Sequence, residues 1–97
     1  MTTKKAVSKN TDSLELNDFV HLHNHTQYSL LDGLTKIPDL IEAVKSMGMD
    51  SIAITDHGTL SGAIEFYSAA RSGGIKPIIG IETYVAARTL HDKEASL

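Results

Sequence analysis

The residues best able to do chemistry lie in three short stretches of the chain. HLHNHT holds His23 and His25, ITDHG holds Asp56 and His57, and GIE holds Glu82. Imidazole and carboxylate groups together are a ligand set suited to Zn²⁺, Mn²⁺ and Fe²⁺. Clustered ions of this kind activate water near neutral pH and clamp a phosphate ester during in-line attack. The three stretches therefore predict a metal-dependent phosphoesterase site, if the fold brings them together.

The spacing of His23 and His25 suits such a site. On a β-strand, residues two apart point the same way and stand ~6–7 Å apart at their Cα atoms. Both rings can then converge on one ion, or serve two ions a few ångströms apart. His21 shares this face one pleat deeper, where a structural role is the better interpretation.

Each of these residues also has a structural interpretation. An isolated pair such as His23 and His25 is more often hydrogen-bonded or exposed than bound to metal. His57 could help a turn, with Asp56 capping the next helix, and Glu82 could be a surface carboxylate. Only their joint placement at predicted strand ends favours a metal site.

The elements that would position these residues alternate between strand and helix. Residues 19–24 have the alternation of a strand, and 51–55 (SIAIT) is a β-branched apolar run typical of a strand buried on both faces. Residues 76–85 predict a third strand, with Pro77 near its start.

Two helices are expected between these strands. Apolar residues recur at spacings of three and four from Ile37 to Met47, with Pro38 in the first turn and Gly48 as the C-terminal stop. A second helix is expected over 60–72, ended by Gly73 and its neighbouring glycine.

The expected order is thus β-α-β-α-β, an α/β fold with parallel strands and right-handed crossovers. In an α/β barrel the carboxyl ends of the strands ring one face, where active sites are built. Three strands leave at least one apolar edge bare. The chain is therefore expected to be cut short.

Composition narrows the class of protein. The chain has 97 residues, 41% apolar and 22% charged, with a net charge of −3 and no cysteine. The overall charge does not favour nucleic acid binding, and disulfides and cysteine-ligated zinc are excluded. No apolar run approaches the ~18 residues of a membrane span, and no secretory signal is evident, so a cytoplasmic location is expected. We expect a disordered leader over 1–18, the first part of a domain over 19–87 and a polar segment over 88–97.

At this point the sequence resembles a family. HLHNHT, ITDHG and GIE resemble the motifs of the polymerase-and-histidinol-phosphatase (PHP) domain. The text around them, HTQYSLLDGL, TDHGTLSGAIEFYSAA and GIKPIIGIETYVA, is similar to the opening of those PHP domains that begin bacterial replicative DNA polymerases. The resemblance covers about residues 19–87, and its motifs are specific in combination.

The resemblance implies a distorted (βα)₇ barrel with a cluster of up to three divalent ions, Zn, Mn or Fe. The ligands it implies within this chain are His23, His25, Asp32, His57 and Glu82. Asp56 would be a supporting residue that orients the site. His21 stands where many members carry Asp, which leaves its role open. His91 lies in the polar tail and has no pattern in its favour.

The resemblance also implies a function for the parent protein. It would be a DNA-directed DNA polymerase, a nucleotidyltransferase whose Mg²⁺-dependent synthesis uses acidic residues of another domain. The PHP domain would act as a 3′–5′ exonuclease or phosphoesterase, or as a structural platform. The alternative is a stand-alone PHP phosphatase of small phosphate esters.

The implied partners belong to the parent protein. They are DNA, deoxynucleoside triphosphates, the sliding clamp, the clamp loader and the proofreading subunit, with no membrane. The 97-residue chain alone has an incomplete ligand set, so we expect it to be catalytically inactive.

Overall fold

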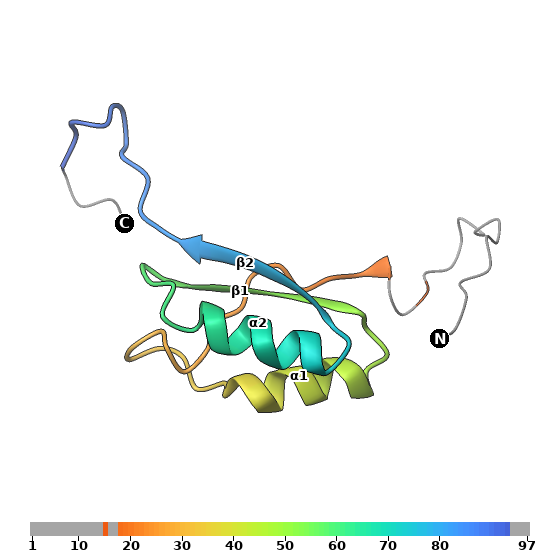
Figure 1. Cartoon of the computed structure of the whole chain (residues 1–97). Helices are drawn as coiled ribbons and strands as arrows, with labels where there is room; N and C mark the ends of the chain where they lie inside the picture. The colour runs from red at the N-terminus through yellow and green to blue at the C-terminus, as the bar shows by residue number, and fades with distance from the viewer. Residues whose placement is uncertain (1–14, 16–17, 94–97) are drawn as a thin grey trace.

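Residues 15 and 18–93 are described by the computed structural model. They contain α1 (Ile37–Ser46), β1 (Ser51–His57), α2 (Ala63–Ser72) and β2 (Lys76–Glu82). The two strands form a parallel sheet, and both helices lie on the same face of it (Figure 1). The expected α/β class with parallel strands is confirmed, whereas the (βα)₇ barrel and its truncation stay predictions.

Helix α1 has the limits that its sequence predicts. Its N-cap is Lys36, with proline in the first turn, where a missing N–H is harmless. The helix closes at Met47, and Gly48 follows with a φ of 76°. This left-handed conformation suits glycine because a Cβ would be strained there.

Helix α2 begins three residues later than expected. Ser61 N–H donates to Thr59 Oγ1 at 3.1 Å, and Ala63 N–H donates to the Leu60 carbonyl at 3.0 Å. These bonds form a separate turn, with Gly62 as the N-cap. The turn residues found local hydrogen-bond partners that compete with the helix, so the expected start at residue 60 was wrong.

Strand β1 lies at the centre of the apolar core. Its residues Ser51 to Ile54 are buried, which agrees with the expectation of a strand covered on both faces. The core unites both helices with β1 and the start of β2 through buried side chains, namely Ile37, Ile41, Val44, Ile52, Ile54, Phe66, Ala70 and Ile75. Burial of such apolar side chains is the main force that holds the helices against the sheet.

Strand β2 ends at Glu82, three residues before its expected end. Its partner β1 ends at His57, and the last backbone bond runs from Gly58 N–H to the Glu82 carbonyl at 2.9 Å. Beyond this point β1 offers no further pairing. Tyr84 and Val85 are 94% and 79% exposed, so their β-favouring side chains are not buried in a sheet.

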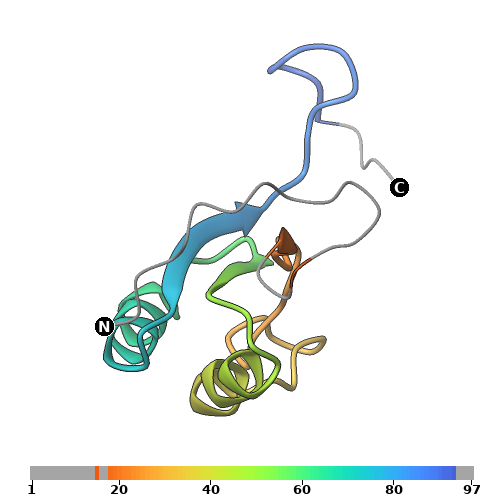
Figure 2. The same ribbon diagram turned by 90° about the vertical axis from the view of Figure 1, so that its right-hand side faces the viewer.

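The expected first strand over 19–24 is not formed as a regular strand. The segment does run beside β1, on the edge opposite β2 (Figure 2), where Ala53 N–H donates to the His21 carbonyl and Thr55 N–H to the Asn24 carbonyl. From His21 to Asn24 the segment advances three residues, while β1 advances only two, from Ala53 to Thr55. Asn24 Nδ2 donates to the carbonyls of His21 and Ala53, at 3.0 and 2.9 Å. Side-chain bonds therefore replace a regular ladder.

The ends of the chain complete the description. The expected leader over 1–18 lies outside the described residues except for 15 and 18, as do 94–97 of the polar tail. Within 88–93, Arg88 Nε contacts Asp92 Oδ2 at 3.2 Å. Neither helix of the described part of the chain is long and apolar enough to cross a membrane.

Candidate metal centre

Strand register brings His57 and Glu82 together. They are paired residues at the carboxyl ends of β1 and β2. Glu82 Oε2 lies 3.2 Å from His57 Nδ1. Parallel strands end at the same edge of a sheet, and this edge therefore carries one imidazole and one carboxylate side by side.

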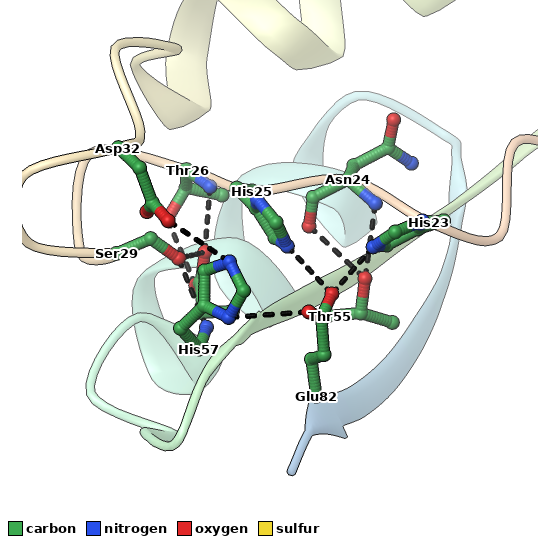
Figure 3. Close-up of polar contacts among 10 residues, drawn as sticks. His23, Asn24, His25, Thr26, Ser29, Asp32, Thr55, His57 and Glu82 are labelled. Carbon is green, nitrogen blue, oxygen red and sulfur yellow. Dashed lines mark hydrogen bonds and ion pairs between the residues drawn. The ribbon is translucent and has the colours of Figure 1, made fainter. Parts of the chain in front are cut away.

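The histidine pair meets Glu82 from the other side of β1. Glu82 Oε1 lies 2.5 Å from His23 Nε2 and 2.8 Å from His25 Nε2 (Figure 3). The rings of His23 and His25 meet edge to face, with centroids 5.1 Å apart. These two imidazoles and the carboxylate form the first donor group.

Asp32 joins the site from the loop after the histidine pair. Its Oδ2 lies 2.9 Å from His57 Nε2. The rings of His25 and His57 stand 4.0 Å apart at their centroids, so His25 lies beside this pair as well. The second donor group is therefore His25, Asp32 and His57, and His25 is common to both groups.

The donor set fits a divalent metal centre. Within each group, one nitrogen or oxygen per residue lies within 4.8 Å of the others. The His25 side chain is 22% exposed and that of His23 is 72% exposed, so ions can reach the site from solvent. Nitrogen and carboxylate oxygen donors suit Zn²⁺, Mn²⁺ and Fe²⁺. Such ions, when bound, polarise a phosphate ester and activate water.

The electrostatics of the site keep Glu82 ready to bind a cation. Hydrogen bonds from His25 and then from His23 lower the pKa of the Glu82 carboxyl group, and the charge of His57 lowers it further. Partial burial acts against these effects but does not cancel them. Glu82 is thus held as a carboxylate, the form in which it ligates metals.

Asp56 lies directly behind the donors and is 1% exposed. Its Oδ1 accepts hydrogen bonds from Thr26 N–H at 2.6 Å and from Ser29 Oγ at 2.8 Å. Its Oδ2 accepts one from Thr26 Oγ1 at 2.9 Å. The side chain therefore joins the end of β1 to the loop that follows the histidine pair.

Asn24 and Thr55 hold the histidine pair to β1, and the sequence did not single them out. Asn24 N–H donates to Thr55 Oγ1 at 3.0 Å, and Thr55 Oγ1 donates to the Asn24 carbonyl at 3.2 Å. Asn24 also contacts Ala53, as described above. The sequence could have indicated this role only through the residue types, because the short side chains of Asn and Thr bond readily to nearby backbone.

Two of the histidines lie outside the donor groups. The His21 imidazole is exposed and stands edge-on to Phe19, with ring centroids 4.8 Å apart. Its carbonyl, rather than its ring, bonds to β1. His91 is exposed in the polar tail.

A pocket of about 490 Å³ opens beside the second donor group. Its lining residues come from the strand ends and the two loops beside them: Asp32, His57, Gly58, Glu82, Thr83 and Tyr84. The pocket therefore adjoins donors from both strands and from the Asp32 loop.

Comparison with known proteins defines the class. Residues 21–97 match the PHP domain, and the chain belongs to this family.

The similarity extends to particular proteins. The chain is 53% identical over 74 residues to DNA polymerase III subunit alpha of Mycobacterium tuberculosis (strain ATCC 25618 / H37Rv), a match that covers 76% of the chain. It is 60% identical over 68 residues, 70% of the chain, to the same subunit of Borreliella burgdorferi. It is 53% identical over 78 residues, 78% of the chain, to that of Thermus aquaticus. Each match covers 6% of the relative's length and falls in its N-terminal region.

Proposed function

We propose that this chain is the metal-binding opening of the PHP domain of a bacterial replicative DNA polymerase alpha subunit. The carrying observation is the convergence of His23, His25, Asp32, His57 and Glu82 at one edge of the sheet. Asp56 and His21 are proposed as supporting residues outside the ligand set. The ions are Zn²⁺, Mn²⁺ or Fe²⁺, and up to three of them bind once the rest of the domain supplies its ligands.

The activity we propose for this site is metal-dependent hydrolysis of phosphodiesters at the 3′ end of DNA. An open site of imidazoles and carboxylates beside a pocket suits an extended phosphate ester. The chain's own residues would bind and orient the ions, and the 97-residue chain alone is expected to be inactive. The alternative substrate is a small phosphate ester.

A structural role for the metals is the second candidate, and one observation favours it. The histidine segment is joined to β1 by irregular bonds instead of a full ladder. Ions held by His23, His25 and Glu82 would cross-link this segment to β2. A scaffold of this kind would position the polymerase and proofreading subunits.

The parent protein has further proposed properties. It would carry out Mg²⁺-dependent DNA-directed DNA synthesis from deoxynucleoside triphosphates, with acidic residues of another domain. Its partners would be DNA, the sliding clamp, the clamp loader and the proofreading subunit, in the cytoplasm.

The test compares metal removal with substrate cleavage in a protein that contains the whole PHP domain. A 3′-labelled single-stranded DNA and p-nitrophenyl phosphate are offered with Mn²⁺, Zn²⁺ or EDTA. Cleavage of the DNA that EDTA abolishes while the fold remains supports the exonuclease. If EDTA lowers the thermal stability and neither substrate is cleaved with Mn²⁺ or Zn²⁺, the scaffold role is supported. Preferential cleavage of p-nitrophenyl phosphate supports the phosphatase.

A further inference from the structure

The loop that carries Asp32 has few apolar contacts near Asp32 itself, although Tyr28 packs against the core. It leaves the β1 edge at Thr26 and returns at Thr35, where Gln27 N–H donates to the Thr35 carbonyl at 2.8 Å. The loop is rich in leucine, but these side chains face solvent. Leu30, Leu31 and Leu34 are 84%, 107% and 95% exposed. Hydrogen bonds, rather than burial, must therefore fix the position of Asp32.

Ser29 makes the hydrogen bonds that can do so. Its side chain is completely buried, and its Oγ donates to Asp56 Oδ1 at 2.8 Å and accepts from His57 N–H at 3.0 Å. Its carbonyl accepts from Asp32 N–H at 3.3 Å and from Gly33 N–H at 2.9 Å. Ser29 is thus a direct link between the end of β1 and the backbone of Asp32.

Of the two residues that Ser29 links, His57 has the firmer support from other contacts. His57 belongs to β1 and is held by its register with Glu82 and by the bond from Gly58 N–H. Asp32 lies in the loop, which Thr26 and Ser29 tie to β1 through Asp56, and Ser29 is the nearer of these two residues to Asp32 in sequence. The Asp32 carboxylate contacts His57 Nε2. Removing the Ser29 hydroxyl should consequently displace Asp32 while His57 stays in place.

The first donor group has a different anchor. Asn24 and Thr55 hold the histidine pair through bonds in which Ser29 takes no part. Ser29 and Asn24 therefore secure two halves of the site separately.

We propose that Ser29 is a positioning residue, which sets the distance between Asp32 and His57 and so the affinity of the second donor group for a divalent cation. The proposal rests on the metal-binding function proposed above. Partners behind metal ligands commonly change metal affinity by about 10–100-fold when they are removed.

The test is a double-mutant cycle on Zn²⁺ affinity in a protein that contains the whole PHP domain, measured by competition with a chromogenic chelator. S29A is expected to weaken Zn²⁺ binding about tenfold. In a D32A background, S29A should have less than a twofold further effect, because the ligand it positions is gone. In an H23A background its effect should remain about tenfold. S46A removes an exposed hydroxyl that bonds to the Ala43 carbonyl on α1, and it should leave Zn²⁺ binding unchanged.

The outcomes separate the two proposals. If the wild-type protein with the whole PHP domain binds no Zn²⁺, the metal function fails and the role of Ser29 with it. If it binds Zn²⁺ but S29A acts equally in the D32A and H23A backgrounds, or has no effect, only the role of Ser29 is overturned. Should S29A prove unfolded by circular dichroism, S29G, which also removes the hydroxyl and adds no metal ligand, is measured in the same cycle.

Discussion

His57 and Glu82 are register partners at the carboxyl ends of β1 and β2, and their side chains touch at 3.2 Å. Neither residue is close to the other in sequence. The pairing of two parallel strands creates the contact, and His23, His25 and Asp32 then close around it. The strength of this arrangement depends on the residues that hold the loops against β1.

Asp56 is expected to be the most sensitive of these residues. D56A removes the acceptor of three hydrogen bonds from Thr26 and Ser29 at a buried position, and should lower the free energy of unfolding by roughly 2–4 kcal/mol. D56N should lose about 1 kcal/mol or less, since an amide oxygen can still accept at Oδ1 and Thr26 Oγ1 can accept from the amide. Urea denaturation measures both values.

Exposed Asp39 provides the control for Asp56. It lies in the first turn of α1, so D39A should cost only about 0.3–1 kcal/mol. Equal destabilisation by D56A and D39A would show that the buried hydrogen bonds contribute little.

Gly33 tests how tightly the Asp32 loop is closed. A Cβ at this position would lie 1.9 Å from the Thr26 carbonyl oxygen and 3.1 Å from Ser29 Cβ. The loop would have to move, so G33A should destabilise the protein by about 1–3 kcal/mol or more and also weaken Zn²⁺ binding. Thermal denaturation and chelator competition provide the two measurements.

Gly74 provides the control for the Gly33 substitution. It has a φ of 75°, and a Cβ there would meet nothing within 4 Å. G74A should therefore cost about 1–2 kcal/mol through backbone strain alone and leave Zn²⁺ affinity intact. A G33A protein that binds Zn²⁺ as well as G74A would contradict the close packing of the loop.

Tyr28 should make the stability of the fold depend on pH in the alkaline range. Its phenol donates a 2.6 Å hydrogen bond to Glu65 Oε1, and this bond, followed by burial and the Glu65 charge, raises the pKa of Tyr28. The contribution to stability is fully present below the ordinary tyrosine pKa of about 10 and is lost as pH rises through the higher folded value. Unfolding midpoints should therefore fall with pH above this range.

The variant Y28F should remove that part of the pH dependence, while Y84F, at an exposed tyrosine, should retain it. Absorbance titration at alkaline pH should likewise show one tyrosine fewer with a raised pKa in Y28F. Parallel stability curves for the wild type and Y28F would exclude the Tyr28–Glu65 bond as the cause.

Part of the fold could be predicted because buried faces require a regular spacing of apolar residues in the sequence. The three-and-four spacing from Ile37 to Val44 and the β-branched run of β1 correspond to side chains that are now in the core. The failure at residues 19–24 has a local cause, since Asn24 supplies bonds that alternation of side chains cannot reveal.

In the candidate site, too, some residues could be placed from the sequence and others could not. The placement of His57 and Glu82 followed from their positions at strand ends, because register fixes residues there. The inclusion of Asp32 came from the family resemblance, since its position depends on a loop whose hydrogen bonds through Ser29 have no periodic pattern.

The metal content of a purified protein that contains the whole PHP domain tests the central claim most directly. Elemental analysis is made on the wild type and on H25A, E82Q and H91A, all prepared identically. His25 is common to both donor groups and Glu82 contacts all three histidines of the site, whereas His91 lies outside it. We predict that the wild type and H91A retain Zn, Mn or Fe through gel filtration, while H25A and E82Q lose it. A wild type without these ions, or an H25A protein that retains as much metal as H91A, would contradict the account.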